Sequence, residues 1–180
     1  MLRPLAVAIA AVTLSACGGQ EEVKVVSSVA DCSANTELSR EDCDAAYTKA
    51  QAEADRTGPK YTNMRTCESE FGLDQCRQRS SGIFMPMMTG FMVGQMLSGR
   101  NSFYNPVYRY SGSSSAYNNR LMTADGAVIG RPGQSSYRVD SSNTKPKPRT
   151  TRTVSRGGFG AVASAKSNWG GGRSSGGWGG

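Results

Sequence analysis

Met85-Pro-Met-Met-Thr-Gly-Phe-Met-Val-Gly-Gln-Met-Leu-Ser-Gly99 is the stretch on which the fold depends, because it holds five of the chain's eight methionines and no charged residue. On a helix that begins near Pro86, three methionines form one stripe and three small residues form a second stripe on roughly the opposite side. The first stripe consists of Met88, Met92 and Met96, and the second of Gly90, Gly94 and Ser98. We therefore predict a Met/Gly-rich apolar helix over residues 80–99.

Three interpretations of this helix are open. A membrane span is permitted by the length of the uncharged segment, although its glycine, proline, serine and glutamine residues and its flanking Arg79 and Arg100 argue against one. A site for monovalent copper would use the methionine thioethers. Small residues at a spacing of four let a second backbone approach closely, and methionine forms an adaptable apolar surface. We expect an association helix that packs on a lipid or protein surface or on a second copy of the chain.

The first sixteen residues have the pattern of a signal peptide. Arg3 precedes a ten-residue apolar run, too short to span a membrane, and Leu14-Ser15-Ala16-Cys17 resembles the lipobox of bacterial lipoproteins. This resemblance implies that residues 1–16 are removed, that Cys17 is acylated and that the chain is anchored in a membrane. Gly18 replaces the aspartate that retains many lipoproteins at the inner membrane, so we expect the outer membrane, with the protein facing the periplasm. Residues 17–30 are expected to form a tether.

Four cysteines remain once Cys17 carries lipid, and an oxidising compartment favours two disulfides. Their spacing lacks the paired C-x2-C ligands of structural zinc sites. Two pairings compete. The geometry of an antiparallel helical hairpin favours Cys43 with Cys76 and Cys32 with Cys67, whereas local loops would join Cys32 to Cys43 and Cys67 to Cys76. We predict the first pairing and keep the second as the alternative.

Residues 31–77 carry the signals of two helices. Ser39 followed by Asp42 indicates a helix that starts at Arg40, and Gly58-Pro59 indicates where it ends. A second helix is expected between Asn63 and Gly72. About forty-five residues cannot bury a sufficient core unaided. We therefore predict a small disulfide-stapled α-helical hairpin as the head of the protein.

Several motifs resemble the YgiB-type family of bacterial envelope proteins. They include Cys43-Asp-Ala-Ala-Tyr47, Cys67-Glu-Ser-Glu-Phe-Gly72, Phe84-Met-Pro-Met-Met-Thr-Gly90 and Thr153-Val-Ser-Arg-Gly-Gly-Phe-Gly160. The likeness covers most of the mature chain, and the four-cysteine block is its most specific part. Because the family is a domain of unknown function, the resemblance implies an envelope location but no substrate and no catalytic residue.

The second half of the chain is basic. Residues 17–76 contain six basic and twelve acidic residues, whereas residues 77–180 contain fourteen basic and two acidic ones. Serine, glycine and arginine dominate residues 100–180, so we predict a long, mostly disordered low-complexity tail, with a hairpin near residues 121–129 around Asp125-Gly126. Export makes nucleic acid an improbable partner. A basic chain in the envelope attracts lipopolysaccharide phosphates or peptidoglycan carboxylates, and an envelope protein is the other expected partner.

No residue pattern points to catalysis or to a cofactor. The chain has no histidine, which removes the usual general base and the commonest metal ligand. We expect a non-enzymatic bacterial envelope lipoprotein that acts as an adaptor or structural component. The alternatives are an accessory subunit of an envelope enzyme or transport assembly and a copper-binding carrier.

Overall fold

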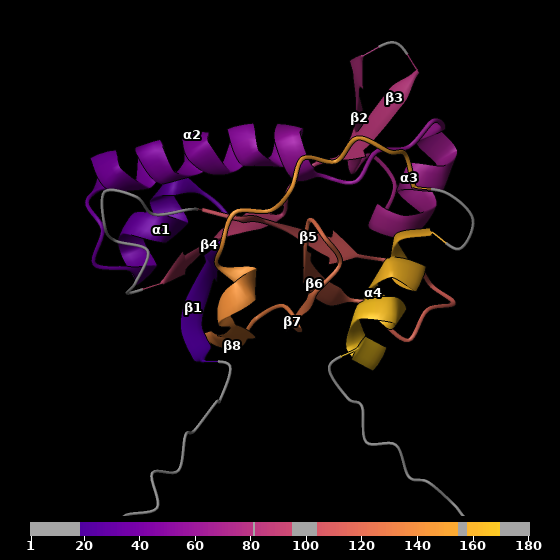
Figure 1. Cartoon of the computed structure of the whole chain (residues 1–180). Helices are drawn as coiled ribbons and strands as arrows, with labels where there is room; N and C mark the ends of the chain where they lie inside the picture. Colours follow the sequence, from indigo (N-terminus) through magenta and orange to yellow (C-terminus); the bar gives the residue numbers. More distant parts are fainter. Residues whose placement is uncertain (1–18, 81, 95–103, 155–157, 170–180) are drawn as a thin grey trace, which may run out of the picture.

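The computed structural model describes residues 19–80, 82–94, 104–154 and 158–169, and its centre is a six-stranded antiparallel sheet (Figure 1). The spatial order of the strands is β7-β6-β5-β4-β1-β8, so the first strand lies inside the sheet between β4 and β8. The strands of this sheet are β1 (Gln20–Val26), β4 (Gly90–Gly94), β5 (Pro106–Tyr110), β6 (Arg120–Thr123), β7 (Val128–Gly130) and β8 (Tyr137–Asp140). A separate hairpin pairs β2 (Cys76–Ser80) with β3 (Ile83–Pro86).

Helices lie around this sheet, and two of them begin and end as predicted. They are α1 (Val29–Asn35), α2 (Arg40–Thr57), α3 (Met64–Phe71) and α4 (Gly158–Trp169), with a short 3-10 helix, η2 (Ser141–Asn143). The Ser39 hydroxyl accepts a hydrogen bond from the Asp42 amide at 3.1 Å, and α2 stops before Gly58. The Asn63 side chain caps α3 through the Thr66 amide, and α3 stops before Gly72, whose φ is +105°. Local capping therefore sets these helix ends.

The predicted helical hairpin head is wrong, because the helices pack on the sheet instead of forming a core of their own. Ala46 and Ala50 of α2 belong to a buried cluster with Phe91 of β4. In α3, the ring of Phe71 lies 6.1 Å from those of Tyr108 and Tyr110 in β5, centre to centre. The sheet supplies the apolar area that forty-five residues lack.

The sheet is curved, and the face turned away from α2 and α3 surrounds a core of its own. All six strands contribute to one buried cluster, whose members are Val23, Met92, Val107, Leu121, Ile129, Tyr137 and Val139. The two edge strands, β7 and β8, also contact each other. The Tyr137 hydroxyl of β8 donates a hydrogen bond at 2.9 Å to the carbonyl of Arg131, which follows β7. The molecule thus has one core inside the curve and two further clusters beneath the helices.

The predicted Met/Gly-rich helix over residues 80–99 is wrong, since its described part forms β3 and β4. Phe91 and Val93 face α2, whereas Met92 points into the concave core, so the side chains alternate with a period of two. Gly90 lies so close to β1 that a Cβ there would stand 2.5 Å from the Val26 carbonyl oxygen. The small residue admits a neighbouring backbone, as expected, but that neighbour is a strand of the same sheet.

The predicted disordered tail is also wrong, because residues 104–154 supply four strands and η2, and residues 158–169 form α4. The hairpin expected near residues 121–129 is confirmed. It pairs β6 with β7 through a turn in which Gly126 has a φ of +82°. Short, polar strands become stable here because each one pairs with a neighbour in the sheet.

The expected tether over residues 17–30 is wrong for its described part, where β1 begins at Gln20 and α1 at Val29.

An extended segment, residues 143–154, crosses from η2 to the ends of α2 and α3, and we call it the strap (Figure 1). The Thr150 amide donates to the Arg56 carbonyl at 3.1 Å, and the Val154 amide donates to that of Lys60 at 2.6 Å. The strap thus fastens the end of α2 to the rest of the fold.

Candidate functional site

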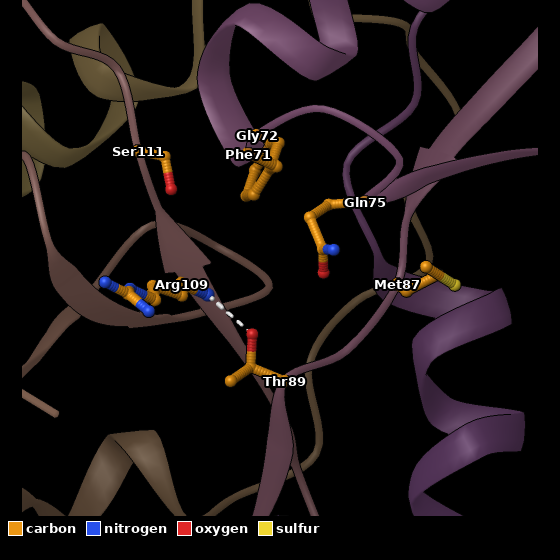
Figure 2. Close-up of a pocket in the computed structure, with 7 residues that line it drawn as sticks. All are labelled: Phe71, Gly72, Gln75, Met87, Thr89, Arg109 and Ser111. Carbon is orange, nitrogen blue, oxygen red and sulfur yellow. Dashed lines mark hydrogen bonds between the residues drawn. The ribbon is translucent and has the colours of Figure 1, made fainter. Parts of the chain in front are cut away.

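A surface cavity of about 370 Å³ opens between the end of α3, the segment that joins β3 to β4, and the end of β5 (Figure 2). Its volume falls in the range of small-molecule and peptide sites. Its walls are made by Phe71, Gly72, Gln75, Met87, Thr89, Arg109 and Ser111. Positive φ at Gly72 ends α3 and turns the chain toward Gln75, which places that side chain at the cavity.

Polar groups from three segments face this space. Figure 2 shows the Gln75 amide and the Thr89 and Ser111 hydroxyl groups around the cavity. Arg109 is the one charged residue among the seven that line it. Its backbone amide donates to Thr89 Oγ1 at 3.2 Å, and its Nε donates to Asn119 Oδ1 at 2.9 Å, which orients the guanidinium. The cavity therefore presents neutral hydrogen-bonding groups, and the guanidinium of Arg109 is turned toward Asn119 at its edge.

Apolar groups complete the cavity. Phe71 is held rigidly, since it makes edge-to-face contacts with Tyr61, Tyr108 and Tyr110. Met87 lies on the other side and is 38% exposed, and Leu73, next to Gly72, is 80% exposed. Exposed apolar side chains beside a polar cavity favour contact with a partner that has both kinds of surface.

A buried carboxylate stabilises the wall behind the cavity without facing it. The backbone carbonyl of Glu70 accepts a hydrogen bond from the Ser111 amide at 2.6 Å. Its carboxylate accepts hydrogen bonds from the Tyr61 hydroxyl and the Phe159 amide. Burial, and after it the Glu70 carboxylate, raises the pKa of Tyr61 far above its usual range, so Tyr61 remains a hydrogen-bond donor near neutral pH. These groups are structural.

The chemistry of the cavity suits binding. Two hydroxyls and an amide can hydrogen-bond a peptide main chain, while Phe71 and Met87 offer apolar contact. Among the residues that the structure describes, no three His, Cys, Asp or Glu side chains gather as a metal site would require.

The four predicted disulfide cysteines do form disulfides, but the predicted pairing of Cys43 with Cys76 and Cys32 with Cys67 is wrong. Cys32 is bonded to Cys43, with their Cα atoms 5.9 Å apart, and Cys67 is bonded to Cys76, with Cα atoms 6.2 Å apart. The local alternative holds because α1 lies beside α2, and α3 lies beside β2. The two helices expected to form a hairpin pack on the sheet instead, where both contact β5.

The residues of the predicted association helix do not form one surface. Met92 and Phe91 are buried on opposite faces of β4, Met88 is partly buried between two apolar clusters, and Gly90 and Gly94 pair with β5 and β1. The predictions for Cys17, Met96 and Ser98 lie outside the described residues.

Sequence reasoning missed every residue of the cavity. The cavity has no motif, because its members come from segments up to forty residues apart. One usable signal was present, since exposed Arg109 alternates with buried Tyr108 and Tyr110 as in a half-buried strand. The serine-, glycine- and arginine-rich composition around that segment predicts a disordered tail instead.

None of the helices in the described part of the chain has the length and apolar character of a membrane span. The curved sheet, the helices on its convex face and the two local disulfides define a small disulfide-bonded α+β protein with a polar surface cavity. The chain belongs to the family described as "Protein of unknown function (DUF1190)", whose pattern matches residues 20–170.

Full-length relatives support this assignment. The chain is 35% identical to the UPF0441 protein of Klebsiella pneumoniae subsp. pneumoniae, over 92% of its own length and 83% of the relative. It is 36% identical to the UPF0441 protein of Erwinia tasmaniensis, over 88% and 80% of the two chains. These relatives confirm the YgiB-type resemblance. No solved structure matches.

Proposed function

We propose that this chain is a lipid-anchored, non-enzymatic adaptor of the bacterial envelope, held at the outer membrane and facing the periplasm. The adaptor would present a folded body to an envelope protein rather than carry out a reaction. Its anchor would be the acylated Cys17, and its contact site the cavity at the end of α3.

The observation that carries this proposal is the short distance between the lipobox and the sheet. Only Gly18 and Gly19 separate Cys17 from Gln20, the first residue of β1. The three residue steps from Cys17 to Gln20 span at most about 11 Å when fully extended. Since β1 is hydrogen-bonded on both sides, acyl chains on Cys17 would hold the whole sheet next to the bilayer.

The cavity supports an adaptor role. Its mixed lining and the exposed Leu73 and Met87 suit a peptide segment of a partner, which needs hydrogen bonds for its main chain and apolar contacts for its side chains. The same feature fits the alternative of an accessory subunit of a larger envelope assembly. Copper binding has no such support, because Met92 is fully buried and shares no stripe with Met88.

Lipid attachment is tested by labelling cells with radioactive palmitate. The full chain should take up label and fractionate with the outer membrane, whereas Cys17→Ser should lose the label and accumulate as precursor. Gly18→Asp provides the matched control, since it should keep the label but move to the inner membrane. Undiminished label on the Cys17→Ser chain would contradict the proposed anchor.

The adaptor role is tested by photocrosslinking in intact cells. A photoreactive residue at Met87 should give one discrete crosslinked envelope protein, identified by mass spectrometry. Val128 is the control position, because it is 36% exposed but lies on β7, away from the cavity. The same crosslinked products from both positions would contradict a specific contact at the cavity.

A further inference from the structure

A cationic surface lies where the end of α2, the base of the β2–β3 hairpin and the strap meet. We define it by five residues from three segments, namely Lys60, Arg77, Arg79, Arg149 and Arg152. The four arginines are exposed, and Lys60 is half-buried. Tertiary contacts bring their three segments together, since only Arg77 with Arg79 and Arg149 with Arg152 are within three residues of each other in the sequence.

Ion pairs and hydrogen bonds place these segments side by side. Arg77 and Arg79 of β2 both contact the Asp55 carboxylate of α2. Lys60 Nζ donates to the Thr150 carbonyl of the strap at 2.5 Å. Since Thr150 lies between Arg149 and Arg152, the strap adds its two cations to those of the hairpin. Nearby Arg56 is paired with Glu53, which leaves Asp55 as the acid among the five cations.

We propose that this cationic surface binds the carboxylates of peptidoglycan. The proposal rests on the envelope location of the proposed function and names a second partner, separate from the cavity. Arginine binds carboxylates through paired N–H groups, and five cations around one acid leave a local excess of positive charge that attracts a polyanion.

Asp55 shows the chemistry that this surface accepts. Its Oδ1 lies 3.5 Å from Arg77 Nη2, and its Oδ2 contacts Arg79. All three side chains are between 33% and 44% exposed, so they stay hydrated and accessible. Exposed ion pairs are weak. A carboxylate on a polymer can therefore replace Asp55 at little cost.

The position of the surface in the fold favours the cell wall over lipid headgroups. Figure 1 shows the start of β1 at one end of the molecule and the β2–β3 hairpin at the other. With an anchor at Cys17, two residues before Gly19, the bilayer lies at the β1 end. The cationic surface then faces away from that bilayer, toward the peptidoglycan layer.

The test is cosedimentation of the purified full-length lipoprotein, in nonionic detergent, with peptidoglycan sacculi. The double variant Arg77→Gln/Arg79→Gln should raise the dissociation constant about tenfold, if each exposed pair contributes a factor of about three to five. The matched control is Arg131→Gln/Arg138→Gln, which removes two exposed arginines near β8 and should change binding less than twofold. Asp55→Asn should tighten binding, because it removes the competing carboxylate.

Each outcome decides the proposal. Weakening by the hairpin variant alone, tightening by Asp55→Asn and loss of binding after the sacculus carboxyl groups are amidated would support it. Equal weakening by the control variant, or absent binding by the unaltered chain, would overturn it. Displacement of the protein from sacculi by micelles of phosphatidylglycerol at equal charge would also overturn the proposal, because the surface would then prefer lipid phosphate. Palmitate labelling is measured on the same preparation, so a failed partner is distinguished from a failed anchor.

Discussion

The carboxylate of Glu70 accepts two hydrogen bonds from the backbone amide of Phe159, at 3.0 Å to Oε1 and 2.8 Å to Oε2. Phe159 is in the first turn of α4, so a buried acid of α3 caps a helix 89 residues further along the chain. The Tyr61 hydroxyl donates to Oε2 at 2.5 Å. Gly158, which precedes Phe159, thus leaves room for a carboxylate of the chain itself, at the helix end where anions are favoured.

Glu70→Gln keeps the shape of this side chain but removes its charge. We expect the free energy of unfolding to fall by about 1–3 kcal/mol, because hydrogen bonds to a charged acceptor are replaced by weaker ones in a buried site. Urea denaturation followed by circular dichroism measures the change. Glu37→Gln, at an exposed position, should alter stability by less than about 0.5 kcal/mol. Equal losses for both variants would contradict the capping role.

Gly158→Ala should destabilise the docking of α4 more than a positive φ alone would. The φ of Gly158 is +67°, and a Cβ there would overlap Glu70 Oε1. Gly133 has a φ of +90° but open space around it, so Gly133→Ala measures the backbone strain by itself, which is about 1 kcal/mol. Thermal unfolding of the two variants compares them. A smaller loss at Gly158 than at Gly133 would be inconsistent with the overlap.

Two buried tyrosines should respond in opposite ways to loss of the hydroxyl. Tyr61→Phe should cost about 1–2 kcal/mol, because it removes the hydrogen bond to Glu70. In the described part of the chain the Tyr108 hydroxyl has no hydrogen-bond partner, so Tyr108→Phe should be neutral or stabilising. Both stabilities are measured by denaturant titration at pH 7. A greater loss from Tyr108→Phe would refute this assignment.

The same tyrosines predict a loss of stability at high pH. Burial raises the pKa of both hydroxyls above the ordinary value of about 10. Because the folded pKa lies above the unfolded one, their contribution is fully present below about pH 10 and is lost as the pH rises further. Unfolding midpoints between pH 8 and 12 should fall above pH 10, and less steeply in the double variant Tyr61→Phe/Tyr108→Phe. Parallel curves for the two proteins would argue against this origin.

Local pairing of the disulfides predicts the products of proteolysis without reductant. Trypsin cleavage at Arg56 or Lys60 should separate the Cys32–Cys43 peptides from the Cys67–Cys76 peptides, because no disulfide crosses these sites. Mass spectrometry of the unreduced digest identifies the pairs. A disulfide-linked species that contains sequence from both sides of Lys60 would contradict the local pairing.

The sequence by itself determined features whose causes lie within a few residues. Ser39 and Gly58 set the ends of α2, Asn63 and Gly72 set those of α3, and Asp125-Gly126 indicated the β6–β7 hairpin. The four cysteines that remain when Cys17 is assigned to lipid indicated two disulfides. Capping side chains, positive φ at glycine and turn geometry act locally, so they can be predicted without knowledge of the fold.

Only the tertiary structure decided that Gly90–Gly94 is a strand and that the second half of the chain is folded. It also decided the pairing of the cysteines and the place of the cavity. Gly-Phe-Met-Val-Gly fits a helix and a strand by its apolar content, and it becomes a strand because β1 and β5 offer hydrogen-bonding edges on its two sides. The polar strands after it are stable only once those edges exist. Gln75 and Arg109 line one cavity for the same reason, since pairing between distant strands places them and no local sequence pattern encodes it.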